Sequence, residues 1–154
     1  MKNFFVAGLL LTSLQTFGQA SVAYYPFREF ISVSTNPSRL VWFDARVQTN
    51  TFFESLTTTL APMINFVRRP NVSYYGGLGV QFNALNSLNN AKIVEGYSLQ
   101  VGVRAVPFPS VPNVRVAFEI APFSNRTGTS GILYSNLGIV YQFKRKTSAE
   151  QPAQ

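Results

Sequence analysis

The chain has 154 residues, a length that indicates one domain, and it carries a formal net charge of +7. Charged residues make up only 12% of the chain, about half the share found in an average globular protein, whereas aromatic residues make up 14%. The sequence contains no His and no Cys, which excludes disulfide bonds, thiol chemistry and most transition-metal sites. We therefore expect no enzyme activity, no metal and no cofactor.

The first twenty residues have the pattern of a secretory signal peptide. Lys2 gives a positive start, an apolar run covers residues 4–14, and Gly18-Gln19-Ala20 is a small-x-small cleavage site. The alternative is an uncleaved anchor helix, for which the apolar run is short, because a spanning helix needs about 20 residues. The sequence predicts an exported mature chain that begins near Ser21. In such a chain, with bases spread singly rather than clustered, no nucleic-acid partner is expected.

Beyond residue 20, apolar residues alternate with small or polar ones, a period that predicts β-strands. Residues 21–34 are expected to form a short strand or a plug-like segment, followed by a turn signal at 35–38. Pro62 lies within one of the later strands and implies a bulge or an edge position, since it cannot donate a ladder hydrogen bond. Six clear strands are predicted, at residues 39–48, 56–67, 72–82, 94–106, 113–123 and 132–143.

The two faces of these strands differ in chemistry. One face is apolar, and the other carries mainly Gly, Ala, Ser and a few long polar residues, which suits the narrow, filled lumen of a small barrel. The other possibility is a half-buried sheet whose second face meets water. Charges inside a lumen must be paired or solvated. The lumen model therefore predicts an ion-pair network formed by Asp44, Arg46, Arg104, Arg115 and Glu119.

Loop lengths and aromatic residues predict an orientation in a bilayer. Compact connections at 68–71 and 107–112 are expected in the periplasm, and the longer ones at 49–55, 84–93 and 124–131 outside. Aromatic side chains should then form two girdles at the membrane interfaces. The expected periplasmic girdle is Phe66, Tyr74, Phe108, Tyr141 and Phe143, and the expected outer girdle is Phe82, Tyr97 and Phe123.

The last strand resembles the C-terminal β-signal of bacterial outer-membrane β-barrel proteins. The resemblance is carried by a polar residue at Asn136, a glycine at Gly138, and aromatic residues at Tyr141 and Phe143. It implies that these four residues form an assembly signal, read by the barrel assembly machinery, and that this strand closes the barrel. With the signal peptide and the alternation, the chain resembles small barrels of the OmpA/OmpX-like group. That resemblance implies an all-β, antiparallel up-and-down transmembrane β-barrel of about eight strands in the cell outer membrane.

The expected organisation is a signal peptide at 1–20, a β-barrel domain at 21–143 and a flexible basic periplasmic tail at 144–154. The resemblance implies a non-catalytic protein with a structural, adhesive or complex-scaffolding role, in contact with outer-membrane lipids. Six clear strands and a short one are fewer than eight, and an open sheet edge cannot face lipid. The wall could therefore be completed in three ways: residues 24–34 form the missing strands, one of the six predicted strands is in fact two, or another chain supplies the rest.

Two alternative functions remain. The first is a subunit that docks on a larger outer-membrane or secretion complex or forms a homo-oligomer, which would complete an unfinished wall. The second is a soluble periplasmic or secreted lipocalin-like binder of small molecules. That binder requires the apolar face of strand 113–123 to point inward, toward a pocket. The residues of this face are Val114, Val116, Phe118 and Ile120.

Overall fold

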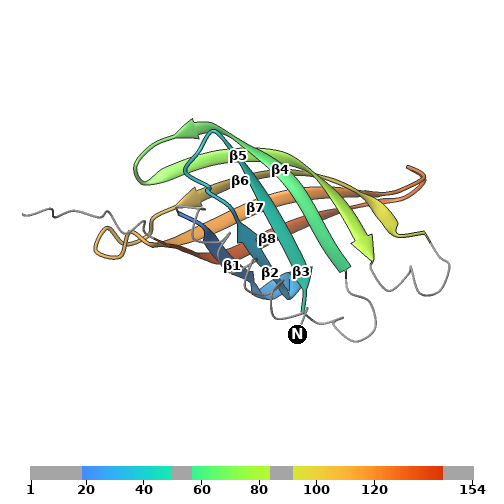
Figure 1. The fold of residues 1–154 in the computed structure, drawn as a ribbon, viewed down its shortest axis with the longest axis horizontal. Helices are drawn as coiled ribbons and strands as arrows, with labels where there is room; N and C mark the ends of the chain where they lie inside the picture. Colours follow the sequence, from blue (N-terminus) through green and yellow to red (C-terminus); the bar gives the residue numbers. More distant parts are fainter. Residues whose placement is uncertain (1–18, 50–56, 84–91, 144–154) are drawn as a thin grey trace, which may run out of the picture.

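The chain folds into a β-barrel (Figure 1). The structure, a computed structural model, describes residues 19–49, 57–83 and 92–143. Its strands are β1 (Ser21–Tyr25), β2 (Phe30–Ser34), β3 (Val41–Gln48), β4 (Thr57–Arg68), β5 (Val72–Asn83), β6 (Val94–Ala105), β7 (Val114–Asn125) and β8 (Gly131–Gln142). A short 3-10 helix, η1 (Pro26–Arg28), joins β1 to β2. No helix in this described part is long and apolar enough to cross a membrane.

Every strand pairs antiparallel with its sequence neighbours, and β8 pairs with β1 to close the sheet. The closing ladder runs from Ser21 opposite Gln142 to Tyr24 opposite Ile139. The prediction of an all-β, antiparallel up-and-down barrel of about eight strands is therefore confirmed. The predicted tail at 144–154, the centres of the loops at 49–55 and 84–93, and nearly all of the predicted signal peptide lie outside the described residues.

The segment 21–34 supplies the strands that the sequence left uncertain. It forms two five-residue strands, β1 and β2, instead of one strand or a plug. Pro26 begins η1, where its fixed φ suits the turn, and Glu29 completes the reversal in the left-handed region with φ of 48°. One chain thus closes its own wall. A missing strand no longer argues for a partner, and oligomer formation stays an untested prediction.

Pro62 lies within β4 and not at a sheet edge, since the closed barrel has no edge there. It stands opposite Phe43 of β3. On the other side, the ladder between β4 and β5 passes over Pro62 and resumes in the same register at Met63, so the missing N–H falls in a gap of the pairing. The register shift in β4 lies between Asn65 and Val67 instead.

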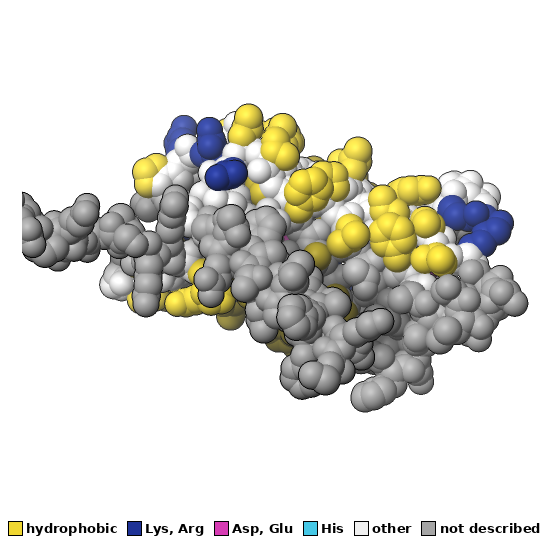
Figure 2. Space-filling model, in the orientation of Figure 1, with side chains coloured by type: hydrophobic (Ala, Val, Ile, Leu, Met, Phe, Trp, Pro, Cys, Tyr) yellow, Lys and Arg dark blue, Asp and Glu magenta, His cyan; other side chains and the backbone are white. Residues whose placement is uncertain are grey.

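The two faces of the wall differ in chemistry: large apolar side chains cover the outside, and the lumen holds the buried charged and polar residues together with aromatic and smaller apolar ones. In β8, Leu137, Ile139 and Tyr141 are exposed on the outside, whereas Asn136 and Val140 are buried in the lumen. Figure 2 shows hydrophobic side chains along the middle of the visible face, with Lys and Arg at its two ends. The strand faces predicted from alternation are thus confirmed. The lipocalin-like alternative predicted that the apolar face of β7 points inward. This prediction is wrong, because that face points outward.

We name the two ends of the barrel by their connections. The turn end carries the connections β2–β3, β4–β5 and β6–β7 and the last residue of β8. The loop end carries η1 and the connections β3–β4, β5–β6 and β7–β8. In Figure 1 the β4–β5 connection lies at the left and the β7–β8 hairpin at the right.

Exposed aromatic residues occur near both ends. The five that were predicted for the periplasmic girdle are exposed near the turn end. Of those predicted for the outer girdle, Tyr97 is exposed near the loop end and Phe82 is half-buried there; Phe27, which was not predicted, is also exposed at this end. Phe123 was expected in the outer girdle, and this expectation is wrong. It shares the inward face of β7 with Ala121, and its ring centroid lies 6.4 Å from that of Tyr134. Phe123 was assigned by its height along the strand, while alternation decides the direction of its side chain.

Candidate functional site

The lumen contains a buried ion network that joins opposite walls of the barrel. Arg46 of β3 reaches Glu119 of β7 through two parallel hydrogen bonds, Nη1 to Oε1 at 2.6 Å and Nη2 to Oε2 at 2.8 Å. Its Nε also donates to Oδ2 of Asp44 at 2.7 Å. All three side chains are buried. Such a two-pronged pairing is the geometry in which a guanidinium and a carboxylate bind each other most strongly.

Neutral donors complete the coordination of both carboxylates. Ser32 and Ser34 donate to Oδ1 of Asp44, at 2.6 and 2.7 Å. Glu119 accepts from the Tyr75 hydroxyl at 3.2 Å and from the side-chain amide of Asn136 at 3.2 Å. A buried ion pair is tolerated when further hydrogen bonds satisfy its remaining atoms. These donors therefore stabilise the two carboxylates inside the barrel.

Arg104 carries the second buried positive charge and is held mainly by aromatic rings. Its guanidinium carbon lies 4.5 Å from the centroid of Trp42 and 5.1 Å from that of Tyr75, within cation–π range. Its Nη2 also lies 3.5 Å from Oγ of Ser34, which donates in turn to Asp44. Two buried arginines thus face two buried carboxylates, and the formal charges of this central group cancel.

Arg115 was predicted in the same network, but the structure does not bring it to a carboxylate. It lies on the inward face of β7 closer to the turn end, and it is only half-buried. Its Nε has no hydrogen-bond partner among the described residues. The position nearer the mouth of the barrel thus leaves Arg115 half-buried, whereas Arg46 and Arg104 are buried.

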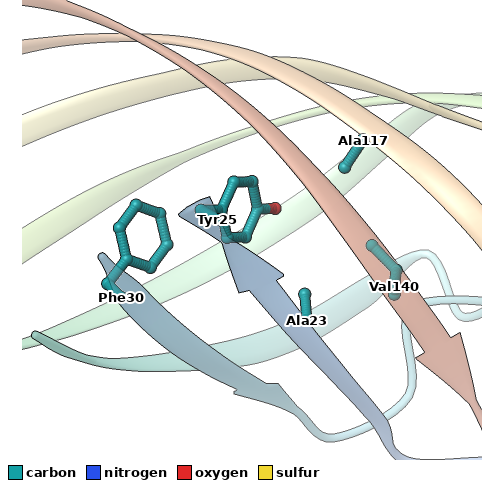
Figure 3. Close-up of a cluster of buried hydrophobic side chains, with 5 residues drawn as sticks. All are labelled: Ala23, Tyr25, Phe30, Ala117 and Val140. Atoms are coloured by element: carbon teal, nitrogen blue, oxygen red, sulfur yellow. The ribbon is translucent and has the colours of Figure 1, made fainter. Parts of the chain in front are cut away.

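Aromatic side chains fill the lumen around the ions. The rings of Tyr25 and Phe30 stack with centroids 4.3 Å apart, beside Ala23, Ala117 and Val140 (Figure 3). A cavity among the described residues, toward the loop end of the lumen, has a volume of about 50 Å³. That volume holds roughly three water molecules, far less than a drug-sized ligand needs. The lumen in the described part of the chain is therefore a packed core.

Two of the four predicted assembly-signal residues also pack inside the barrel. Asn136 donates to Glu119, and Gly138 leaves room for Tyr25, whose ring would lie 2.6 Å from a Cβ at that position. Tyr141 and Phe143 lie outside, with their rings edge to face at 5.2 Å. The polar and glycine positions thus have structural reasons of their own. Recognition by assembly machinery stays a prediction.

The structure adds residues that the sequence reading did not single out. Trp42, Tyr75 and Tyr25 surround the two buried arginines, and Ser32 and Ser34 bind Asp44. Alternation along the strands could have identified the aromatic ones. It places Trp42 and Tyr75 on the same strand face as Asp44 and the glycines, which is the inward face. A large aromatic residue on that face indicates lumen filling.

Replacing Asn136 by Ala should destabilise the barrel by about 1–3 kcal/mol, because Glu119 loses a buried donor. Ser135→Ala, on the outer face of the same strand, should change stability by less than about 0.5 kcal/mol. Unfolding in denaturant can be followed by the fluorescence of Trp42, the only tryptophan of the sequence. Equal stability of the two variants would show that the Asn136–Glu119 hydrogen bond does not stabilise the barrel.

Comparisons with known proteins give no match: no family model, no curated protein and no solved structure matches the chain. No group of three or more His, Cys, Asp or Glu that could hold a metal occurs among residues 19–49, 57–83 and 92–143. Function is therefore inferred from the barrel itself.

Proposed function

We propose that the chain is a small integral β-barrel protein of the bacterial outer membrane, exported by a cleaved signal peptide. Its role in this proposal is non-catalytic, and it is structural, adhesive or complex-scaffolding. The observation that carries the proposal is the inverted polarity of the barrel. The ions lie inside, and large apolar side chains cover the outside.

The outer wall is apolar on every strand. Exposed side chains at the middle of the wall include Leu78, Leu99, Val101, Phe118 and Ile120. A water-soluble monomer rarely exposes a continuous apolar patch larger than a few hundred Å². An apolar band between two zones of aromatic residues is the arrangement that a lipid bilayer stabilises.

The filled lumen also limits what the protein can do. Arg46, Glu119 and the rings of Tyr25 and Phe30 occupy the interior, which argues against an open channel. Both lumen carboxylates that could serve acid–base chemistry are engaged by Arg46 and lie away from solvent. The surfaces left for interaction are the wall and the two ends, which fits a scaffolding role.

Refolding with and without lipid tests the proposal. The mature chain, denatured in urea, is diluted either into buffer or into phosphatidylcholine vesicles, and folding is followed by circular dichroism and by Trp42 fluorescence. We expect β-structure and a buried Trp42 only in the presence of vesicles or detergent. A folded, monodisperse protein in buffer alone would contradict the membrane assignment.

A further inference from the structure

We propose that the turn end of the barrel carries a binding surface for the phosphate headgroups of anionic phospholipids. The surface, which we call the arginine rim, consists of Arg39, Arg68 and Arg69. The inference deepens the proposed function and rests on it, because it assumes that the apolar wall lies in a bilayer.

The arginine rim is built from two connections held side by side. Arg39 lies in the β2–β3 connection, Arg68 ends β4, and Arg69 follows it. The buried side chain of Asn65 donates to the carbonyls of Pro37 and Arg39. Two further hydrogen bonds hold the β2–β3 connection against the end of β4: Asn65 N–H to Leu40 O at 2.8 Å, and Arg68 Nη1 to Ser38 O at 3.5 Å. The spacing of the arginine backbones is therefore fixed by the fold.

No acidic side chain shares this surface within the described residues. Asp44 and Glu119 are buried in the lumen, and Glu29 and Glu95 lie at the loop end. The rim arginines are exposed, and neither described ion pair includes any of them. The rim is thus a local cluster of positive charge that is open to an anion.

The neighbouring wall indicates which anion fits. Directly beside the arginines, the outer surface exposes Leu40, Val41, Phe66, Val67 and Tyr74. Bases that lie just beyond an aromatic and aliphatic band stand at the level of lipid headgroups. Guanidinium groups bind phosphate oxygens through paired hydrogen bonds. A lipid satisfies both surfaces at once, with acyl chains on the wall and its phosphate on the rim.

The loop end shows no comparable cluster among its described residues. Two of its basic residues have an acidic residue close in the sequence, since Glu29 directly follows Arg28 and Glu95 comes three positions after Lys92. Arg28 is also engaged, with its guanidinium carbon 3.3 Å from the centroid of Tyr134. Arg126 and Lys92 therefore provide a control pair, at the opposite end, for the test of the rim.

The experiment measures lipid binding by native mass spectrometry. The mature barrel in a neutral detergent is titrated with phosphatidylglycerol and, separately, with zwitterionic phosphatidylcholine. We expect the first lipid to bind roughly tenfold more tightly, because each base near an anionic headgroup adds to the attraction. The triple variant Arg39→Gln, Arg68→Gln, Arg69→Gln should lose most of this preference. The double variant Lys92→Gln, Arg126→Gln should keep the preference. The basic tail is intact in all variants, so a difference belongs to the rim.

Equal binding of both lipids by the wild-type protein would overturn the proposal, and so would a preference that survives undiminished in the triple variant. Displacement of phosphatidylglycerol by millimolar inorganic phosphate would also overturn it, by showing an anion site without lipid specificity. Binding of poly-glutamate that depends on the rim, with no lipid preference, would assign the rim to an acidic protein instead. Insertion of the wild-type chain into phosphatidylcholine vesicles is measured in parallel. If the chain inserts but shows no lipid preference, the arginine-rim proposal fails while the membrane assignment stands; if it does not insert, the membrane assignment itself fails.

Discussion

Replacing Glu119 by Gln is expected to destabilise the barrel by about 3–5 kcal/mol, the usual effect of breaking one half of a buried ion pair. The substitution keeps the shape of the side chain and removes one negative charge from the lumen. Arg46 and Arg104 would then face Asp44 alone, which leaves a buried positive charge without compensation. Denaturant unfolding in detergent or vesicles, followed by Trp42 fluorescence, measures the change.

Two further variants show whether charge is the cause. Glu95→Gln removes a carboxylate whose hydrogen-bond partners in the described part of the chain are the neutral amides of Gln81 and Asn83, and it should have an effect below about 1 kcal/mol. The double variant Arg46→Met, Glu119→Gln leaves Asp44 and Arg104 as the remaining pair. It should be more stable than Glu119→Gln alone, because the lumen is neutral again. A double variant that is less stable than the single one would show that shape, and not charge balance, dominates.

Replacing Leu78 by Arg should destabilise the membrane-inserted barrel by about 2–4 kcal/mol. Leu78 lies in the middle of β5, opposite Leu99, and the residue is 66% exposed on the outer wall. In a bilayer that position falls near the midplane, where a guanidinium lies farthest from water. The free energy of unfolding in phosphatidylcholine vesicles, measured by urea titration, gives the effect.

Leu133→Arg provides the matched control. Leu133 is 68% exposed, nearly the same as Leu78, but it lies close to the loop end of β8. Near an interface the same substitution should change stability by about 0–1 kcal/mol. On a water-exposed wall both substitutions would stay within about 0.5 kcal/mol. Equal effects at the two positions would therefore contradict a bilayer around the wall.

The faces of the strands could be predicted from the sequence because, in a barrel wall, side chains alternate between the lumen and the outside at every residue. Alternation placed Asp44, Arg46 and Glu119 on the lumen side and Phe118 and Ile120 outside, and the structure agrees. The strand count was harder, because β1 and β2 are short and Pro26 interrupts their period. A five-residue strand gives too few repeats for alternation to be distinguished from chance.

The partners inside the lumen could not be predicted. Alternation tells that Arg46 and Glu119 face the same space, but 73 positions separate them, and only the closure of the barrel sets their distance. The sequence also could not predict how deep the other two lumen arginines lie in the barrel. Arg104 lies deep enough to stack on Trp42, and Arg115 lies near the mouth. Depth depends on strand register and tilt, which the sequence does not specify residue by residue.

The most direct test of a barrel that closes within one chain and sits in a membrane is gel mobility. The mature protein is extracted in detergent and run without boiling and after boiling. We predict a band near the monomer mass that shifts on heating, since a closed barrel resists the gel detergent until it is unfolded. A heat-labile band at a multiple of the monomer mass would show a wall shared between chains. No shift, for a protein soluble in buffer alone, would contradict the membrane barrel.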